Sequence, residues 1–340
     1  MVQIQLRQLW MIIISWMIIG FLIAVYDYLV LHTNNSAGPA PGYSLLLSIA
    51  VNMGMGLFGA LLGGSFLIFY VNVRFRDKSY GYTIFAVTVS FIVIILLINL
   101  ILRALGNPDT ARLQKNGLVW AVVVGVTQLL VQVNNKFGQG NFWNIITGKY
   151  NTPREERRIF MFLDLNASTT LAEKLGDKKY HEMLKDFFTD ITNPILNNHG
   201  EIYQYVGDEV VIAWKYDDGI AGSKCVKCFF DIKLHIEGLK DKYLKQYGTV
   251  PSFKAGLHCG QVVAGEVGII KRDITYSGDV LNTTSRIQSM CKELNEEVIA
   301  SADLIASIHP DSRYVTQKLG SIRLRGKEKE MQLVSLRPVA

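Results

Sequence analysis

The stretch 200-GEIYQYVGDEVVIAW-214 predicts a β-hairpin whose turn carries a carboxylate. Two runs rich in β-branched and aromatic residues flank the pair Gly207-Asp208, and such a pair suits a two-residue turn. An aspartate at a turn is common and by itself indicates only the turn. A second predicted strand, within 159-IFMFLDLNAST-169, also ends in a carboxylate, Asp164. Two strand-end carboxylates that meet in space would form a site for a divalent metal ion.

The first 140 residues carry an excess of hydrophobic residues that predicts membrane helices. The chain of 340 residues is 49% hydrophobic, with a mean hydropathy of +0.21, and four stretches of this part contain no charged residue. A bilayer core requires about 20 apolar residues in a helix, whereas a buried helix of a soluble bundle would have a polar face. We therefore expect four transmembrane helices, near residues 9–30, 46–70, 82–103 and 117–134.

The distribution of basic residues predicts the orientation of these helices. An even number of spans places both termini on one side of the membrane. The loop 74-RFRDK-78 and the basic segment that begins at Lys136 are expected to be cytoplasmic, because cytoplasmic loops collect Lys and Arg. The loop 33-TNNSAGPAPGY-43 has neither residue, which suits the outside, whereas the loop after the third span disagrees because it contains three basic residues. The expected location is the cell membrane, with the second half of the chain in the cytoplasm.

The net charge of +6 agrees with an anionic membrane surface, so a lipid bilayer is the expected partner. The sequence shows no pattern of basic and aromatic residues typical of a nucleic-acid groove, and no nucleic-acid partner is expected. In the second span, 52-NMGMGLFGALLGGS-65, small residues would let helices approach closely. The contact could lie within one four-helix unit or between two chains, and the sequence leaves both arrangements open.

The four cysteines, all in the second half, predict neither a metal site nor a disulfide. Cys225 and Cys228 form a Cys-x-x-Cys pair, but no second pair completes a set of zinc ligands. The pair lies in a segment with apolar residues at helical spacing, which favours two small hydrophobic side chains on a helix face. Thiols that stay free imply a reducing, intracellular compartment.

The residue pattern predicts two domains joined by a linker. Residues 1–135 form the membrane part, residues 136–157 a polar, Gly-containing linker, and residues 158–340 a domain of alternating strands and helices. Strands are expected at 158–164, in the hairpin 201–214, and at 252–259, 261–267, 273–277, 296–300 and 331–336, with helices at 168–175, 178–198, 219–246 and 279–293. This alternation predicts an α/β or α+β sandwich with one sheet covered by helices.

The residues after Asp164 are expected to open a helix. Ser168 and Thr169 stand at its start, where a hydroxyl group can satisfy free backbone N–H groups. The same end of a helix attracts anions. A carboxylate beside a helix N-terminus would suit a metal-bound polyphosphate, although an ordinary strand–turn–helix capped by Ser168 explains the same residues.

Three further segments change the interpretation of these residues. They are 255-AGLHCGQVVAGEVG-268, 275-TYSGDVLNTTSRIQ-288 and 324-LRGKEKEM-331. Together with the two carboxylate strands they make five motifs in one order, and with them residues 155–340 resemble the catalytic domain of class III nucleotidyl cyclases, the adenylate and guanylate cyclase family. The chain is similar to the membrane-anchored bacterial type with a four-helix membrane domain. The resemblance implies an α+β, ferredoxin-like βαβ palm that converts a nucleoside triphosphate into its 3′,5′-cyclic monophosphate and pyrophosphate.

The resemblance also implies how the metal would be held. Asp164 and Asp208 match the two aspartates that bind two Mg²⁺ or Mn²⁺ ions in the family, and Leu165 is assigned to the same metal site. Ser168 and Thr169 are assigned to the bound substrate.

Other positions match family residues that act on the ribose and the phosphates. Asn282 and Arg286 match the Asn and Arg that orient the ribose and stabilise the transition state, and Lys327 matches the lysine that binds the triphosphate. In the family, the metal residues and the transition-state residues of one site come from different protomers. A chain that carries both sets implies a head-to-tail homodimer with two equivalent sites.

Base recognition is where the sequence departs from the family pattern. Gln204 occupies the position of the adenine-reading lysine, and Thr275 occupies its partner position. Thr matches one subgroup of adenylate cyclases, and a Gln amide can serve adenine or, flipped, guanine. We therefore expect ATP as the substrate, with GTP or relaxed specificity as the alternative.

Two competing functions are weighed against a mononucleotide cyclase. The hairpin of Asp208 superficially resembles that of a diguanylate cyclase, but the match of residues 275–286 and of Lys327 disfavours this enzyme. A catalytically silent membrane receptor that binds nucleotide is supported only by the substitution at Gln204.

Overall fold

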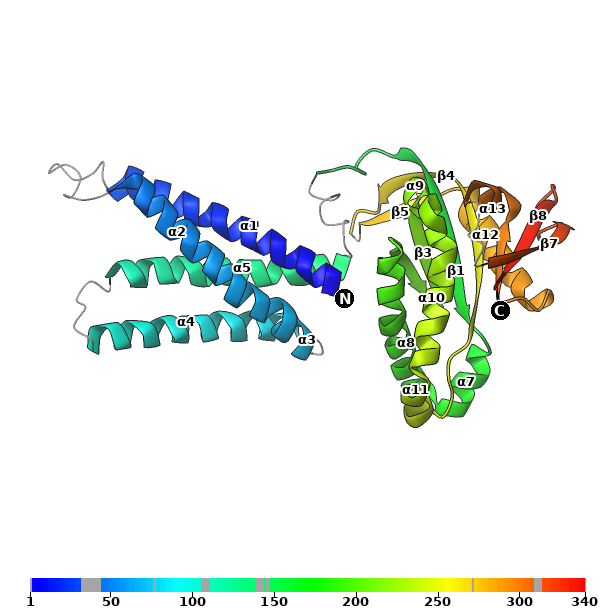
Figure 1. Cartoon of the computed structure of the whole chain (residues 1–340), viewed down its shortest axis with the longest axis horizontal. Coiled ribbons are helices and arrows are strands. Elements are labelled where there is room, and N and C mark those ends of the chain that lie inside the picture. Colours follow the sequence, from blue (N-terminus) through cyan, green and yellow to red (C-terminus); the bar gives the residue numbers. More distant parts are fainter. Residues whose placement is uncertain are drawn as a thin grey trace. The chain divides into compact units, whose positions relative to one another are not determined.

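The computed structural model describes residues 2–31, 44–75, 78–104, 111–137, 144, 147–270, 272–308 and 314–339. The chain divides into two compact units, Met1–Phe137 and Gly138–Ala340 (Figure 1). The predicted outer loop 33–43 and the linker residues 138–143, 145 and 146 lie outside the described residues.

The first unit consists of apolar helices, some of which pass into π-helical turns. They are α1 (Val2–Tyr26) with η1 (Asp27–Leu31), α2 (Leu45–Gly59) with η2 (Ala60–Gly64), η3 (Phe66–Val71) and α3 (Asn72–Arg74), α4 (Tyr80–Ala104) and α5 (Ala111–Phe137). Three segments are long and apolar enough to cross a membrane, namely Gln8–Leu29, Leu45–Arg74 and Gly117–Asn134. The span predicted at 82–103 falls on α4, where the apolar helix found among the described residues, Tyr80–Ile94, is shorter, so this span stays a prediction.

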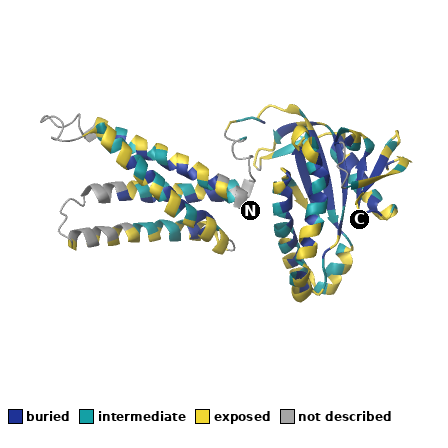
Figure 2. Cartoon of the chain, in the orientation of Figure 1, coloured by how far each residue is buried: buried dark blue, intermediate teal, exposed yellow. Residues whose placement is uncertain are grey.

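The outer surface of these helices is rich in large hydrophobic side chains. Trp10 is 64% exposed, Leu46 79% and Phe85 69%. Exposed positions recur along the described parts of all four long helices (Figure 2). A water-soluble helix would present polar residues at such positions, so this surface suits a lipid environment.

Helices α1 and α2 pack closely because glycines stand at their crossing. A Cβ atom added at Gly20 would lie 2.4 Å from the carbonyl O of Asn52, and one at Gly56 would lie 2.5 Å from that of Trp16. The indole of Trp16 also donates a hydrogen bond to Thr127 of α5 at 2.9 Å. The sequence left open whether the small residues of the second span pack within one unit or between two chains. Gly56 packs against α1 of its own chain.

The second unit is built on one mixed sheet. Its strands are β1 (Arg154–Leu165), β2 (Glu201–Val206), β3 (Glu209–Lys215), β4 (Phe253–Val267), β5 (Asp273–Ser277), β6 (Val298–Ser301), β7 (Tyr314–Ile322) and β8 (Met331–Pro338). The strands lie in the order β2-β3-β1-β4-β6-β8-β7, and β5 pairs with β4. The order β2-β3-β1-β4, with helices after β1 and β3, is the βαββαβ arrangement that the ferredoxin-like expectation requires.

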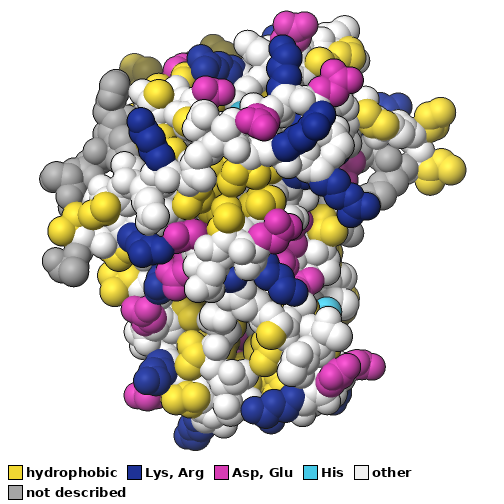
Figure 3. All heavy atoms as spheres, turned by 90° about the vertical axis from the view of Figure 1, so that its right-hand side faces the viewer, with side chains coloured by type: hydrophobic (Ala, Val, Ile, Leu, Met, Phe, Trp, Pro, Cys, Tyr) yellow, Lys and Arg dark blue, Asp and Glu magenta, His cyan; other side chains and the backbone are white. Residues whose placement is uncertain are grey.

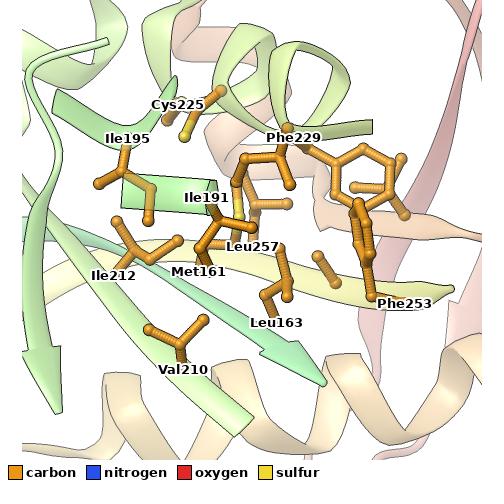
Figure 4. Packing of buried hydrophobic residues seen from close by; sticks show 14 of the residues in the cluster. Met161, Leu163, Ile191, Ile195, Val210, Ile212, Cys225, Phe229, Phe253 and Leu257 are labelled. Carbon is orange, nitrogen blue, oxygen red and sulfur yellow. The ribbon is translucent and has the colours of Figure 1, made fainter. Parts of the chain in front are cut away.

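Helices cover both faces of this sheet. They are α7 (Ser168–Leu175), α8 (Asp177–Asn197), α9 (Tyr216–Ile220), α10 (Lys224–Gly238), α11 (Lys240–Tyr247), α12 (Asp279–Glu293) and α13 (Ala302–Ile308). Side chains alternate along β1, so that Met161 and Leu163 enter the main core, which α8 and α10 complete (Figure 4). Phe160 and Phe162 point to the opposite face, into a smaller core that includes Val280 of α12.

Strand β4 is continuous, where the sequence predicted two strands, 252–259 and 261–267. The predicted break at Gly260 is wrong because this glycine makes room for a helix instead of a turn. A Cβ atom there would lie 2.6 Å from Cγ2 of Val280 on α12. Strand β1 pairs with β4 from Arg154 onward, so it begins before the predicted residue 158 and includes the end of the predicted linker.

The single helix predicted at 219–246 is also wrong. The chain forms α9, a short 3-10 turn, α10 and α11, because Gly222 and Ser223 have positive φ values of 62° and 56°. The sequence also missed α13 and β7. Among the described strands β7 pairs with β8, and most of its side chains are exposed, so it lacks the apolar alternation of a strand with a buried face.

All four cysteines are free and buried. Cys225 and Cys228 lie in the main core beside Phe229 of α10. Burial raises the pKa of the Cys225 thiol to about 12, which keeps it protonated and unreactive. The prediction of two small hydrophobic side chains on a helix face is confirmed.

Candidate active site

The hairpin turn and the end of β1 bring the two predicted metal-binding aspartates together. Asp164 pairs across the ladder with Glu209 of β3, and Asp208 precedes Glu209 in the turn. Gly207 has φ +63° at the first turn position, where glycine is favoured. The two carboxyl groups lie close enough for the charge of Asp208 to raise the pKa of Asp164.

Three carboxyl groups crowd this corner of the sheet. Burial raises the pKa of Asp164 to about 6, and the neighbouring Asp208 adds to the effect. Burial also raises the pKa of Glu209 to about 7, again with both aspartates as further causes. Like charges held this close favour a shared proton or a cation between them. The crowding therefore fits a divalent cation.

The protein supplies only part of a metal coordination shell here. No group of three or more His, Cys, Asp and Glu side chains in the described part of the chain is arranged to hold a metal ion. Leu165, the third predicted metal position, has its side chain in the main core, so only its backbone can face the carboxylates. Two aspartates would leave coordination positions for phosphate oxygens, as is usual for Mg²⁺.

Gln288 is a neighbour of Asp164 that the sequence did not indicate. Its Nε2 donates to Oδ2 of Asp164 at 3.3 Å. Helix α12 comes near enough because Gly256 of β4 has no side chain, and a Cβ atom there would lie 2.4 Å from the backbone N of Gln288. The contact depends on helix packing, so no local sequence signal could have found it.

Helix α7 begins at Ser168, as predicted, but Ser168 does not cap it. The N-cap is Ala167 in a left-handed conformation, φ 54° and ψ 35°, without a side-chain capping hydrogen bond. The Ser168 side chain instead lies near Tyr180 of α8, whose pKa is raised by burial and by the charge of Asp208. Thr169 is exposed in the first turn. A simple capping role for Ser168 is therefore wrong.

Helix α12 and the loop before β8 carry the residues that are predicted to bind the phosphates and the ribose. Asn282 and Arg286 stand one turn apart on the same helix face. The guanidinium of Arg286 lies beside Gly326, where an added Cβ atom would be 3.4 Å from Nη2. Lys327, the next residue, forms an ion pair with Asp279 in the first turn of α12.

Asp279, which the sequence did not single out, holds Lys327 within the single chain. The hydrogen bond from Lys327 lowers the pKa of Asp279. The Asp279 side chain is 75% exposed, and exposed ion pairs contribute little stability. A polyphosphate, with its greater negative charge, can therefore compete for Lys327. The sequence feature that could have indicated this role of Asp279 is its position directly after Gly278.

The carboxylates and the predicted cationic residues lie on different sides of α12. Gln288 touches Asp164, whereas Arg286 faces Gly326. Residues two apart in a helix lie about 200° apart, almost on opposite sides. Hydrogen bonds and ion pairs among the described residues join neither Arg286 nor Lys327 to Asp164 or Asp208. One chain thus holds a carboxylate half and a cationic half.

The two predicted base-reading residues lie on separate strands. Gln204 is exposed on β2 and pairs with Val211, whose side chain belongs to the smaller core. Thr275 of β5 donates its hydroxyl to the backbone O of Gly265 at 3.5 Å, while its neighbour Tyr276 packs against that core. Within the described residues, no hydrogen bond joins Gln204 to Thr275.

Two surface features bear on the predicted partners. A groove of about 530 Å³ lies between α8 and α10, and none of the predicted site residues lines it. On the face drawn in Figure 3, acidic and basic side chains are interspersed around exposed hydrophobic ones, so the positive charge does not form a basic stripe there. The expectation of no nucleic-acid partner stays a prediction.

A ferredoxin-like sheet with paired carboxylates at a hairpin, and an Asn–Arg pair on the helix beside it, has the organisation of a nucleotide cyclase palm. Residues 151–336 match the model of the family described as "Adenylate and Guanylate cyclase catalytic domain". The chain belongs to this family.

Individual relatives agree with the family but differ in their nucleotide. The chain is 39% identical over 222 residues to Adenylate cyclase 2 of Rhizobium meliloti (strain 1021), a match that covers 65% of this chain and 61% of that protein. It is 25% identical over 191 residues to Guanylate cyclase 2G of Mus musculus, covering 54% of this chain and 17% of that one. Both matches span less than two thirds of the relative's length.

Among solved structures, the chain is similar to a bacterial light-regulated adenylyl cyclase. The TM-score is 0.56 at 19% identity, and the match covers 68% of this chain and 67% of the other. At this identity the likeness shows the fold alone.

Proposed function

We propose that this protein is a membrane-bound adenylate cyclase that converts ATP into 3′,5′-cyclic AMP and pyrophosphate for intracellular signalling. Its family supports the proposal, as does its 39% identity to a protein named as an adenylate cyclase. The observation that carries it is the presence of two complementary half-sites in one chain. Asp164 and Asp208 form the carboxylate half, and Arg286 with Lys327 forms the cationic half.

The carboxylate half is suited to a metal-bound triphosphate. Asp164, Asp208 and the backbone of Leu165 would hold two divalent cations, Mg²⁺ or Mn²⁺, which would lower the pKa of the ribose 3′-hydroxyl and neutralise the phosphates. Ser168 and Thr169 begin α7, whose first backbone N–H groups can bind a phosphate oxygen.

The cationic half is suited to the ribose and the transferred phosphate. Lys327 binds the triphosphate after leaving Asp279, and Asn282 orients the ribose. Arg286 presents a planar guanidinium to the negative charge that builds up on the transferred phosphate. Both α12 residues project from one helix face, so a single substrate can contact them together.

A second copy of the chain brings the two halves together. Arg286 projects from α12 away from the Gln288 side that touches Asp164 in its own chain, so its natural target is the carboxylate half of a partner. A head-to-tail pair related by a twofold axis then contains two equivalent sites.

The first unit would anchor this dimer in the cell membrane, with the second unit in the cytoplasm. Three membrane-length apolar helices support the anchor, and the span expected at 82–103 would be a fourth. The basic loop at 74–78 supports a cytoplasmic location for the side that carries the second unit.

A second candidate function differs from the first in the nucleobase of its substrate. Gln204 replaces the family's adenine-reading lysine, and its exposed amide can donate and accept. A guanylate cyclase, or a cyclase of relaxed specificity, is therefore the alternative. Thr275 and the relative at 39% identity favour ATP.

Product analysis tests the proposal directly. Purified full-length protein is incubated with Mn²⁺ and either ATP or GTP, and the products are identified by mass spectrometry. Cyclic AMP as the main product supports the adenylate cyclase, and cyclic GMP supports the alternative. A dimeric sample that makes no cyclic product from either nucleotide contradicts both and favours a silent receptor. Asp164→Ala is the control and should be folded but inactive.

A further inference from the structure

Two strands that are not neighbours in the sheet are joined across its face. Strand β2 is separated from β5 by β3, β1 and β4, which in a flat sheet would place them about 19 Å apart. Yet the backbone N–H of Tyr276 on β5 donates to Oη of Tyr203 on β2 at 3.3 Å, and their ring centroids are 5.0 Å apart. The sheet therefore curls so far that β2 and β5 come into contact.

An aromatic residue of the central strand fills the space beneath this contact. The ring of Phe160 on β1 lies 6.4 Å from that of Tyr203 and 5.6 Å from that of Tyr276, in both cases edge to face. Phe160 is fully buried. The three rings therefore pack in favourable geometry, and the hydroxyl of Tyr203 adds a directional bond to the packing.

A buried arginine makes a second connection between the same two strands. Arg158 is only 2% exposed, and its guanidinium carbon lies 5.0 Å from the ring centroid of Tyr276. It forms an ion pair with Glu201 of β2 at 3.3 Å and another with Glu156 at 2.7 Å. A buried cation needs such partners. Arg158 thus links β5, through the Tyr276 ring, to β2, through Glu201.

These connections stand directly beside the predicted base-reading residues. The register of β2 and β3 shifts between Ile202 and Gln204, so Tyr203 occupies a bulge and Gln204 follows it on the face of the smaller core. On β5, Thr275 immediately precedes Tyr276. The contacts of Tyr203 and Arg158 therefore set the distance between the strands that carry Gln204 and Thr275.

We propose that Tyr203 and Arg158 are positioning residues for base recognition, which hold the strands of Gln204 and Thr275 at the spacing that one purine requires. This inference rests on the proposed function, because it assumes that a nucleotide base lies against these strands. It makes base discrimination a property of the curled sheet as well as of Gln204 itself.

Tyr203→Phe tests the proposal because it keeps the ring and removes only the hydroxyl. The affinities of full-length protein for ATP and GTP are measured by competition with a fluorescent nucleotide, which requires no turnover. We expect the ratio of the two affinities to move toward unity by about threefold, the size of one neutral hydrogen bond. The Mn²⁺ concentration for half-maximal binding should stay unchanged, and the thermal unfolding temperature should fall by only about 2–4 °C.

Tyr205→Phe is the matched control. Tyr205 lies on the same strand, but it pairs with Val210 and its ring lies 4.6 Å from Phe188 of α8, on the other face of the sheet. Its loss of a hydroxyl should leave the ATP to GTP ratio unchanged. Glu201→Gln is a second, independent variant, which weakens the hold of Arg158 on β2 and should shift the ratio in the same direction as Tyr203→Phe.

The outcomes separate this proposal from the proposed function. If the ratio of the affinities for ATP and GTP is unchanged in both Tyr203→Phe and Glu201→Gln, the positioning role of Tyr203 and Arg158 is overturned. An equal loss of affinity for both nucleotides overturns it as well. A shifted ratio in wild-type-like folded variants supports it. Failure of the wild type to make a cyclic product would overturn the proposed function instead, and the binding ratio would still decide the role of Tyr203.

Discussion

At the scale of single residues, the most informative groups are Asp164 and Glu209. Their carboxyl groups have raised pKa values, about 6 and about 7, because both are partly buried and crowded by Asp208. Each would release a proton readily in water. In this corner of the sheet, a proton and a cation therefore compete for the same carboxylates.

Divalent metal is expected to stabilise the protein more at pH 8 than at pH 5. The folded chain holds protons on Asp164 and Glu209 more tightly than the unfolded chain, whose ordinary pKa values are 3.8 and 4.5. Without metal, these groups cost stability as the pH rises from about 4 to about 7. A bound cation removes that cost, and thermal unfolding with and without Mn²⁺ at the two pH values measures the difference.

The control for this pH effect is Asp164→Asn, which removes one of the titrating groups while keeping a side chain of the same size. Its stabilisation by Mn²⁺ should be smaller than that of the wild type at pH 8. Equal stabilisation by Mn²⁺ at pH 5 and pH 8 in the wild type would contradict the assignment of the metal to these carboxylates.

Gln288→Leu should weaken metal binding about tenfold, which is the usual cost of losing a hydrogen bond to a metal ligand. The amide of Gln288 donates to Oδ2 of Asp164 and so fixes the orientation of the carboxylate. The dissociation constant of Mn²⁺, measured by electron paramagnetic resonance, is the readout. Ser289→Ala, an exposed change on the same helix, is the control. An Mn²⁺ affinity like that of the wild type would show that Asp164 is oriented by other contacts.

At the scale of elements, helix α12 decides the geometry of the candidate site. It packs directly against the backbone of β4, because Gly256 and Gly260 have no side chains that would hold it away. Gln288 and Arg286 on its two sides depend on that seating. A helix that moved outward would change both half-sites at once.

Gly256→Ala is expected to destabilise the second unit. The added Cβ atom would lie 2.4 Å from the backbone N and 2.7 Å from the Cα of Gln288, so the helix itself must move. Overpacking of this kind costs about 1–3 kcal/mol, and each kcal/mol lowers the unfolding temperature of a unit of this size by about 2–4 °C. Differential scanning fluorimetry measures the shift.

Gly238→Ala is the control for this substitution. A Cβ atom at Gly238 would have no heavy atom within 4 Å, and the residue ends α10 without a positive φ. Its unfolding temperature should match that of the wild type. If Gly256→Ala and Gly238→Ala unfold at the same temperature, α12 is not held as closely as described.

At the scale of the whole molecule, the two half-sites predict that activity belongs to a pair of chains. Asp164→Ala and Arg286→Ala chains should each be inactive alone, because every dimer of either kind lacks one half of both sites. Mixed dimers contain one complete site. Co-expression of equal amounts should therefore restore about a quarter of the wild-type cyclase activity.

Separate tags on the two chains allow the mixed dimers to be purified and counted. Two Asp164→Ala chains with different tags form the control, and their dimers should have no activity. Mixed dimers that are isolated intact but remain inactive would mean that each site is built within one chain, which contradicts the proposed homodimer.

The local signals in the sequence were sufficient for the parts of the site that lie within one element. Helix α12 is observed at the predicted residues 279–293, and α7 at 168–175. A carboxylate at a strand end, a Gly-Asp turn and an i, i+4 pair on a helix are all properties of a few consecutive residues. The sequence therefore located Asp164 and Asp208 and the helix face of Asn282 and Arg286.

Contacts between distant elements decided the rest. The sequence could not show that Gly260 continues a strand beneath α12, that Gln288 reaches Asp164, or that Tyr203 meets Tyr276 across three strands. Each of these depends on where the sheet curls and how closely a helix approaches it. Such distances follow from the packing of the whole core, and only the tertiary structure contains them.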